Sequence, residues 1–346
     1  MRVEDFDYDL PRDLIAQHPA ERRDESRLLV LHRGSGGIEH RRFRDVVDYL
    51  EPGDLLVLND TRVIPARLVG RRTSGGRVEL LLIQPEGDAW HAMLKCRGHL
   101  QPGEELSLEG GALACTYRGR SADGRALLAF GLGPEELAAA LERAGRAPLP
   151  PYIKRPPDED PHRAADLERY QTVYARRPGA IAAPTAGLHF TPEVLDRLKA
   201  KGVARAMVTL HVGLGTFKPV TAERVEDHVM HAEHFELSEA AARAIVAARA
   251  SGGRIVAVGT TAARVLETVA RLPRVGPASG WTDLFITPGF EFRLTDALIT
   301  NFHLPRSTLL MLVAAFAGRE AVLAAYEEAK SQGYRFYSYG DAMLIL

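Results

Sequence analysis

The sequence predicts a mixed α/β fold, in which an α/β main domain is interrupted by an inserted small antiparallel β-barrel domain. Three observations lead to this prediction: short apolar runs between glycine-rich turns from about residue 69 to 132, a proline-rich stretch after them, and alternating strand and helix patterns beyond it. We therefore expect residues 63–149 to form the barrel domain. Residues 1–62 and 150–346 are then expected to form one discontinuous α/β domain.

Composition is that of an ordinary globular protein. The 346 residues are 46% hydrophobic and 26% charged, which excludes a disordered or collagen-like chain. The apolar stretch 309–317 is too short to cross a membrane and the acidic N-terminus is unlike a signal peptide, so we expect a cytoplasmic protein without a membrane partner. Cys96 and Cys115 are the only cysteines, and we expect both to be reduced thiols.

The N-terminal half contains one buried strand and then the barrel strands. The buried strand is predicted at residues 54–60, where an apolar run leads to Asn59 and Asp60. The barrel strands are predicted at residues 78–83, 90–96, 105–108, 113–117 and 126–130. Prolines at 148, 150, 151, 156, 157 and 161 then predict an extended connector, because each fixes its own φ and disfavours helix in the preceding residue.

The C-terminal half alternates between helices and strands. Thr191 is predicted to cap a helix that ends near Gly202, and a strand follows at residues 206–212. Ser238 is predicted to cap a helix that ends near residue 250, before a strand at 254–258 and a helix that opens at Gly259. Ser307 is a possible cap of the first of two helices between about 306 and 332, and a terminal segment spans 334–346.

The charge pattern limits where a nucleic acid would bind. The formal net charge is −1, so any RNA site must be local. One basic cluster comprises Arg62, Arg67, Arg71, Arg72 and Arg77, and the other comprises Lys154, Arg155, His162, Arg163 and Arg169. Taken alone, most clusters of this kind are a solvated surface.

Two loops with glycine and histidine are candidates for a ligand site. Gly187 and His189 precede a helix start, whose free N–H groups attract a carboxylate or a phosphate. Taken alone, these residues are better explained by a capped helix that follows a tight turn. Strand alternation places Met207, Thr209 and His211 on one face. His211 then faces solvent or a cleft, or it is a structural histidine beside a bulge.

Three further segments carry polar groups. The segment from Gly259 to Arg264 follows an apolar strand, where open α/β sheets bind ligands, yet it matches neither a dinucleotide-binding nor a P-loop motif. The segment 301–307 is a second polar cluster before a helix. His228, His231 and His234 with Glu233 suggest a metal site, but acid–base catalysis or phosphate contact explains this spacing better.

Seven motifs, in order along nearly the whole chain, resemble one family. They occupy residues 58–67, 170–175, 183–191, 209–217, 258–261, 300–305 and 338–343. With these motifs the sequence resembles the S-adenosylmethionine:tRNA ribosyltransferase-isomerases of queuosine biosynthesis. The resemblance also implies an α/β domain interrupted by a β-barrel.

The resemblance implies a reaction in which S-adenosylmethionine is a consumed cosubstrate. Its ribosyl part passes to 7-aminomethyl-7-deazaguanine at the wobble position of a tRNA, giving epoxyqueuosine and releasing adenine and methionine. The sulfonium acidifies the adjacent C5′–H, so a base can form an ylide, adenine can leave on protonation and the tRNA amine can attack the sugar. This chemistry needs at least one base and one acid, and histidine suits both near neutral pH.

The candidate site residues fall into three groups. The catalytic candidates are His189, His211, His231, Glu233, His303 and Asp60. The candidates for binding the cosubstrate are Thr185, Gly187, Gly213, Gly215, Thr216, Thr260 and Thr261. The candidates for binding substrate or tRNA are Arg62, Arg67, Lys154, Arg155, Tyr170, Gln171, Arg264 and Asn301. We expect no metal, and we expect a monomer because no dimer helix stands out.

Two alternatives belong to other functional classes. A nonenzymatic RNA-binding protein would use the barrel and its arginines as a contact surface, with the histidine loops as structure. A metal-dependent hydrolase would use the histidine cluster. The nearly neutral net charge weakens the first alternative, and the absence of a helix-borne HExxH pattern weakens the second.

Overall fold

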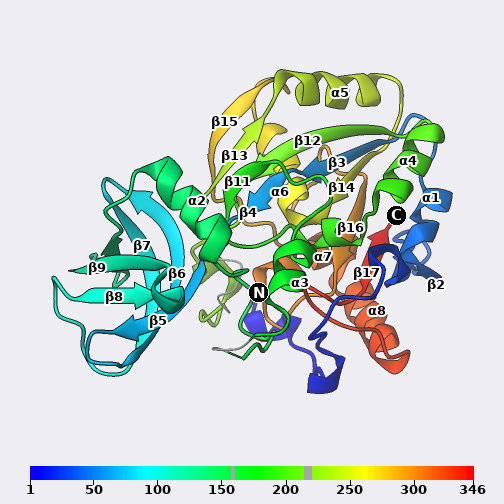
Figure 1. The fold of residues 1–346 in the computed structure, drawn as a ribbon. Coiled ribbons are helices and arrows are strands. Elements are labelled where there is room, and N and C mark those ends of the chain that lie inside the picture. The colour runs from blue at the N-terminus through cyan, green and yellow to red at the C-terminus, as the bar shows by residue number, and fades with distance from the viewer. Residues whose placement is uncertain (157–159, 214–219) are drawn as a thin grey trace.

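The fold consists of a large mixed sheet with helices on both faces and a closed β-barrel beside it (Figure 1). This computed structural model describes residues 1–156, 160–213 and 220–346. It confirms the predicted mixed α/β fold with an antiparallel barrel. The barrel strands lie within residues 63–149, and the exact domain boundaries stay a prediction.

The nine-stranded sheet has a parallel centre. Its order is β15 (Ala278–Thr282), β13 (Glu233–Leu237), β12 (Ala204–Leu210), β3 (Leu55–Asn59), β14 (Ile255–Val258), β16 (Ala297–Asn301), β17 (Ala342–Ile345), β1 (Arg27–Leu31) and β2 (Ile38–Arg42). The four strands from β12 to β16 are mutually parallel. Their carboxyl ends therefore meet at one edge, which is where open α/β sheets bind ligands.

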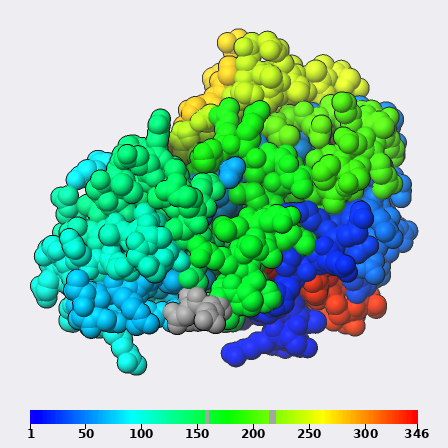
Figure 2. Space-filling model, in the orientation of Figure 1, coloured from blue at the N-terminus to red at the C-terminus, as the bar shows by residue number. Residues whose placement is uncertain are grey.

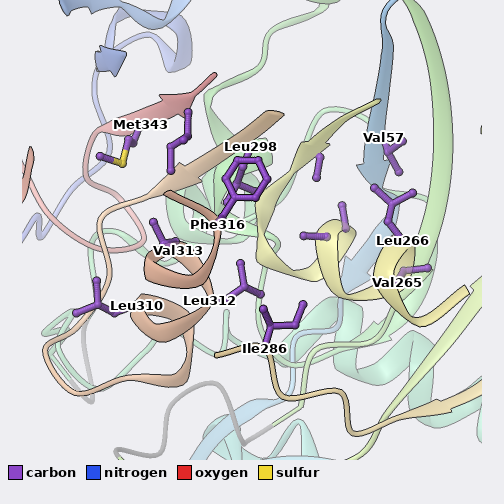
Figure 3. Packing of buried hydrophobic residues seen from close by; sticks show 14 of the residues in the cluster. Val57, Val265, Leu266, Ile286, Leu298, Leu310, Leu312, Val313, Phe316 and Met343 are labelled. Carbon is purple, nitrogen blue, oxygen red and sulfur yellow. The ribbon is translucent and has the colours of Figure 1, made fainter. Parts of the chain in front are cut away.

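Helices cover both faces of this sheet. The α/β helices are α1 (Val46–Tyr49), α3 (Arg163–Arg169), α4 (Pro192–Ala200), α5 (Glu239–Ala250), α6 (Gly259–Val269), α7 (Thr308–Ala317) and α8 (Arg319–Ser331). Figure 3 shows Leu266 of α6 and Leu312 of α7 in the same apolar cluster as Leu298 of β16. Helices α1 and α4 contribute to a second cluster on the opposite face. Burial on both sides explains why the central strands are continuously apolar.

The predicted helix caps are present. Thr191 Oγ1 accepts from the Val194 amide at 3.3 Å, and Ser238 Oγ accepts from the Ala241 amide at 3.2 Å. Ser307 Oγ accepts from the Leu310 amide at 3.2 Å and so caps α7. Gly318, at φ +88°, separates α7 from α8. Each cap satisfies an N–H group that the first turn of the helix leaves without a partner.

Among the described residues, no single helix is long and apolar enough to cross a membrane, and α7 and α8 reach that length and composition only as a pair bent by 112°.

The closed barrel forms a lobe beside the α/β domain, visible at the left of Figure 2. Its order is β10 (Ala126–Ala129), β7 (Ala89–Cys96), β6 (Arg77–Glu86), β5 (Arg67–Arg72), β8 (Glu105–Leu108) and β9 (Leu113–Arg120). Helix α2 (Pro134–Ala144) packs Leu137 and Leu141 into the barrel core. Cys96 and Cys115 are free thiols, as predicted. Strand β5 was not among the predicted strands, because its arginines conceal the apolar pattern.

Short segments join the two parts. Strand β4 (Thr61–Val63) pairs in parallel with β11 (Arg177–Ala180).

The 3₁₀ helices are η1 (Val3–Phe6), η2 (Arg12–Leu14), η3 (Arg23–Glu25), η4 (Phe43–Asp45), η5 (Glu109–Gly111), η6 (Thr185–His189) and η8 (Val225–Asp227). The connector at residues 145–156 contains no helix, as predicted, whereas its Pro157 lies outside the described residues.

The strand predicted at residues 206–212 differs from the observed strand in where it ends and in how deeply it is buried. Strand β12 ends at Leu210, so His211 follows the strand rather than belonging to it. His211, which was predicted to face solvent or a cleft, is half-buried, and Thr209 on the same predicted face is only 3% exposed. The reason is that Asp60 and the segments after β3 cover this end of the strand.

Candidate functional site

A cavity lies at the carboxyl edge of the parallel strands. It encloses about 830 Å³ of empty space, including open solvent at its mouth. Eight predicted site residues line it: Tyr170, Thr185, Glu233, Thr260, Thr261, Arg264, Asn301 and His303. Segments far apart in the sequence therefore contribute to one site.

Strand ends explain this convergence. Asn301 is the last residue of β16, and Gly259 directly follows the neighbouring parallel strand β14. Gly259 adopts φ +86°, which favours glycine, and this sharp turn starts α6 at the cavity with Thr260 and Thr261. The free N–H groups at the start of α6 make this wall suited to an anionic group.

A buried ion pair forms one side of the cavity. The guanidinium of Arg264 contacts the Glu233 carboxylate and donates to the carbonyls of Leu284 and Thr282, both at 3.1 Å. The Gly213 amide donates to Glu233 at 2.9 Å. Both charged side chains are buried, and these bonds compensate for their lost hydration. Arg264 and Glu233 are thus held in fixed positions.

His303 is the imidazole that lines the cavity. Its Nε2 lies 2.7 Å from Thr300 Oγ1, whose hydroxyl donates to the Asn301 carbonyl at 3.2 Å. Burial lowers the pKa of His303 to about 3, because the interior disfavours the charged ring. His303 is therefore neutral at physiological pH.

His189 lies behind the cavity wall rather than in it. Its Nδ1 is 2.7 Å from Ser26 Oγ, its Nε2 is 3.2 Å from Asn301 Nδ2, and its ring stacks on Phe43. Burial lowers the pKa of His189 to about 3. Gly187, in the same 3₁₀ helix, does not line the cavity either, and its place is set by close packing against Tyr174.

His211 and Asp60 form a separate cluster beside β4 and β11. His211 Nδ1 lies 2.8 Å from Thr61 Oγ1, and burial together with His234 lowers the pKa of His211. Asp60 is buried and accepts from the Thr209 hydroxyl at 2.6 Å. Neither residue lines the cavity.

The histidine segment after residue 227 does not converge on one point. His231 is exposed, the His228 ring packs on Phe285, and the His234 ring packs near His211 and Trp281. Within the described ranges, no three His, Cys, Asp or Glu residues are grouped so that they could hold a metal ion. The metal-site alternative thus gains no geometric support, and the absence of a metal stays a prediction.

The predicted tRNA-binding residues lie in different environments. Arg62 is exposed and pairs with Glu142 at 3.1 Å, whereas the partly buried Arg67 pairs with Glu79. Lys154 is exposed. The side chain of Arg155 is only 1% exposed and pairs with Asp166, so it presents no guanidinium at the surface.

Of the remaining predicted site residues, two have contacts within the protein and two lie outside the described residues. Gln171 holds β4 by bonding both the N–H and the carbonyl of Val63, a structural arrangement. Gly213 touches the site only through its bond to Glu233. Gly215 and Thr216 lie outside the described residues.

Several residues of this region were not predicted as site residues. Tyr152, Tyr337 and Ser338 line the cavity. Asn59, at the end of β3, donates to Thr261 Oγ1 at 3.2 Å and so braces the start of α6. Asn59 and Ser338 lie in the family motifs 58–67 and 338–343, and this membership could have identified them as site residues. Nothing in the local sequence pattern indicates such a role for Tyr152.

Comparisons with known proteins agree with one another. A family model described as "Queuosine biosynthesis protein" matches residues 3–345. An S-adenosylmethionine:tRNA ribosyltransferase-isomerase of Moorella thermoacetica is 55% identical and one of Pelobacter propionicus is 53% identical, with each alignment covering 100% of both chains. The crystal structure of an S-adenosylmethionine tRNA ribosyltransferase from Thermotoga maritima is similar with a TM-score of 0.57 and 44% identity, covering 99% of this chain and 100% of that one.

Proposed function

The chain belongs to the queuosine biosynthesis protein family, and from this premise we propose that it is an enzyme that transfers and isomerises the ribosyl part of S-adenosylmethionine onto tRNA. The acceptor is 7-aminomethyl-7-deazaguanine at the wobble position, and the products are epoxyqueuosine-tRNA, adenine and methionine. One observation carries the proposal: eight residues predicted for this chemistry line a single cavity at the carboxyl edge of the sheet.

His303 is the proposed proton acceptor. Its neutral ring lines the cavity, and the Thr300 hydroxyl, which donates to a carbonyl, is then an acceptor for His303 Nε2–H. This arrangement leaves the Nδ1 lone pair available to take the proton from C5′ next to the sulfonium. Removal of that proton forms the ylide, from which adenine leaves as it is protonated and the tRNA amine attacks the sugar carbon. The carbon–sulfur bond then breaks and releases methionine.

The paired groups at the other side of the cavity are the proposed site of the methionyl part. The start of α6, with Thr260 and Thr261, attracts its carboxylate, and the Glu233 carboxylate attracts its ammonium group. Because Arg264 balances the charge of Glu233, a zwitterion can bind there without leaving a buried charge unpaired.

tRNA is the proposed macromolecular partner. Arg62, which is exposed at the junction of the barrel and the α/β domain, is suited to contact its phosphates. We further propose a monomer that works in the cytoplasm, without a metal and without a membrane partner.

Product release tests this function. The protein is mixed with S-adenosylmethionine and with tRNA that carries 7-aminomethyl-7-deazaguanine, and mass spectrometry measures free adenine and methionine. A control tRNA carries guanine at the same position. We expect both products, with a matching mass gain on the anticodon base, only with the modified tRNA. Binding of this tRNA without product release would overturn the enzyme proposal and favour a nonenzymatic RNA-binding protein.

A further inference from the structure

Asn301 lines the cavity, and its side chain carries a buried hydrogen-bond acceptor that no described group uses. Asn301 is 2% exposed, and its Nδ2 donates to the Tyr337 carbonyl at 3.0 Å and lies 3.2 Å from His189 Nε2. In the part of the chain that the structure describes, Asn301 Oδ1 has no hydrogen-bond partner. A buried amide oxygen without a partner costs free energy, which a ligand with an N–H or O–H donor would recover.

The orientation of this amide is fixed by its neighbours. The Tyr337 carbonyl can only accept, so it must face Nδ2 rather than Oδ1. His189 Nε2 must also accept from Nδ2, so the ring hydrogen resides on Nδ1 and points to Ser26 Oγ. The Ser26 hydroxyl in turn donates to the Arg23 carbonyl at 3.1 Å. Every group in this series of hydrogen bonds therefore donates in the same direction. The Asn301 amide consequently has one fixed orientation.

The position of Asn301 sets it apart from the charged groups of the cavity. From β12 to β16 there are three strand spacings, about 14 Å in all. Glu233 and Arg264 lie towards the β12 side, the start of α6 follows β14, and Asn301 ends β16. The cavity thus has a charged end and an end at Asn301.

Aromatic side chains surround the Asn301 end. Tyr152, Tyr170 and Tyr337 line the cavity, and the rings of Tyr152 and Tyr337 are 4.8 Å apart. Such walls favour a flat heteroaromatic ring, while the charged end favours a zwitterion. An extended molecule with an amino-acid group at one end and a purine at the other matches this polarity.

We propose that Asn301 Oδ1 accepts a hydrogen bond from the exocyclic amine of the adenine ring and selects adenine over a 6-oxo purine, with His189 as the positioning residue that orients Asn301. The inference rests on the proposed function, since it assumes that S-adenosylmethionine occupies the cavity. A 6-oxo purine would place a carbonyl oxygen against Oδ1, and two acceptors repel each other. His189 then acts through Asn301 and is not itself a base.

Two unreactive thioethers test the selectivity directly. S-adenosylhomocysteine and S-inosylhomocysteine differ at the purine 6-position, and neither has the sulfonium that the reaction needs. Their inhibition constants are measured against S-adenosylmethionine in the adenine-release assay with the modified tRNA. We expect the wild-type protein to bind the adenosyl compound about 10-fold or more tightly. Equal inhibition constants would overturn the proposal without any variant, and adenine release itself would still support the proposed function.

Variants of Asn301 and His189 test whether these residues produce the preference for the adenosyl compound. Asn301→Ala is expected to bring the ratio of the two constants close to one, mainly by weakening the adenosyl compound. His189→Leu is expected to lower the ratio as well, because the amide then keeps only its bond to the Tyr337 carbonyl and its orientation is held less tightly. His189→Gln is expected to retain the ratio, because its amide oxygen replaces Nε2 as the acceptor. Thr260→Val is the matched control at the other end of the cavity, and it is expected to change both constants by the same factor.

The outcomes separate a specific role from a structural one. A fall in melting temperature with an unchanged ratio in Asn301→Ala would mean that Asn301 only supports the wall, and the proposal would be wrong. The same holds if His189→Leu and His189→Gln have equal ratios. Absence of adenine release in the wild-type protein would instead contradict the proposed function.

Discussion

Burial fixes the protonation state of the two histidines nearest the cavity. His189 and His303 are both buried, and their pKa values are lowered to about 3 because the interior disfavours an imidazolium. A neutral ring can accept a hydrogen bond or a proton, and these are the two roles proposed for His189 and His303. His189 accepts from Asn301, whereas His303 lines the cavity where a substrate proton can reach it.

These pKa values predict a pH-dependent stability. In the unfolded chain both histidines titrate near 6.5, so between pH 6.5 and 3 the unfolded state binds more protons than the folded state. The contribution of these two groups to the free energy of unfolding should therefore be constant above pH 6.5. At pH values below 6.5 the free energy of unfolding should decrease, by at most about 1.4 kcal/mol per pH unit for each histidine. Urea denaturation of wild type and His303→Gln at pH 7.5 and 5.0 measures this. Equal pH dependence in both proteins would contradict it.

Loss of the His303 ring should strongly reduce turnover. A positioned general base contributes about 10²- to 10⁴-fold, so His303→Gln should reduce adenine release by about that factor, with a smaller change in the KM for S-adenosylmethionine. Steady-state kinetics with the modified tRNA measure both quantities. His99→Gln, at an exposed position in a barrel loop, is the control and should retain wild-type rates. Normal turnover in folded His303→Gln would exclude His303 as the base.

Among the elements, η6 connects the cavity wall to the histidine behind it. Thr185 at its start lines the cavity, and His189 at its end contacts Asn301. Gly187 between them has no room for a side chain, since a Cβ would lie 2.1 Å from Tyr174 Oη. The packing of η6 against Tyr174 therefore sets the positions of both ends.

Gly187→Ala should displace this element. Because the neighbouring Tyr174 hydroxyl is itself buried, we expect a loss of about 1–3 kcal/mol in the free energy of unfolding together with reduced adenine release. Urea denaturation and the release assay measure the two effects. Gly276→Ala is the matched control, because nothing lies within 4 Å of its Cβ and it needs no positive φ, so stability should be unchanged. A Gly187→Ala protein as stable as this control would contradict the packing argument.

For the whole molecule, the proposed tRNA-binding surface lies where the barrel meets the α/β domain. Arg62 follows β3 and pairs with Glu142 on α2, so it lies where the chain passes from one part to the other (Figure 1). With a net charge of −1, affinity for tRNA must come from such local cations rather than from the overall field.

Arg62→Ala should therefore weaken tRNA binding. If Arg62 contacts a phosphate, the dependence of log Kd on log salt should become shallower by about one unit or slightly less, while the KM for S-adenosylmethionine stays the same. Filter binding at several salt concentrations measures this slope. Arg243→Ala, an exposed arginine on α5, is the control. Equal slopes in both variants would remove Arg62 from the tRNA-binding surface.

Local signals were enough to predict the fold class, most of the barrel strands and the capped helices of the C-terminal half. The caps at Thr191, Ser238 and Ser307 act through neighbouring backbone, and the apolar strands are read from a short window. Other elements were not predicted, because arginines or a mixed pattern hide their buried faces and pairing decides their structure; they are strands β1, β2, β4, β5, β11, β13, β15, β16 and β17 and helices α1, α2 and α3.

By itself, the sequence determined the α/β and barrel composition, the helix starts and the family resemblance, because these depend on residues close together in the chain. Only the tertiary structure decided which candidates share a site. It brought Glu233, Arg264, Asn301 and His303 to one cavity, and it placed His189 behind the wall and His211 with Asp60 in another cluster. The physical reason is that strand order and burial, which join residues far apart in the chain, set the neighbours and the charge state of each side chain.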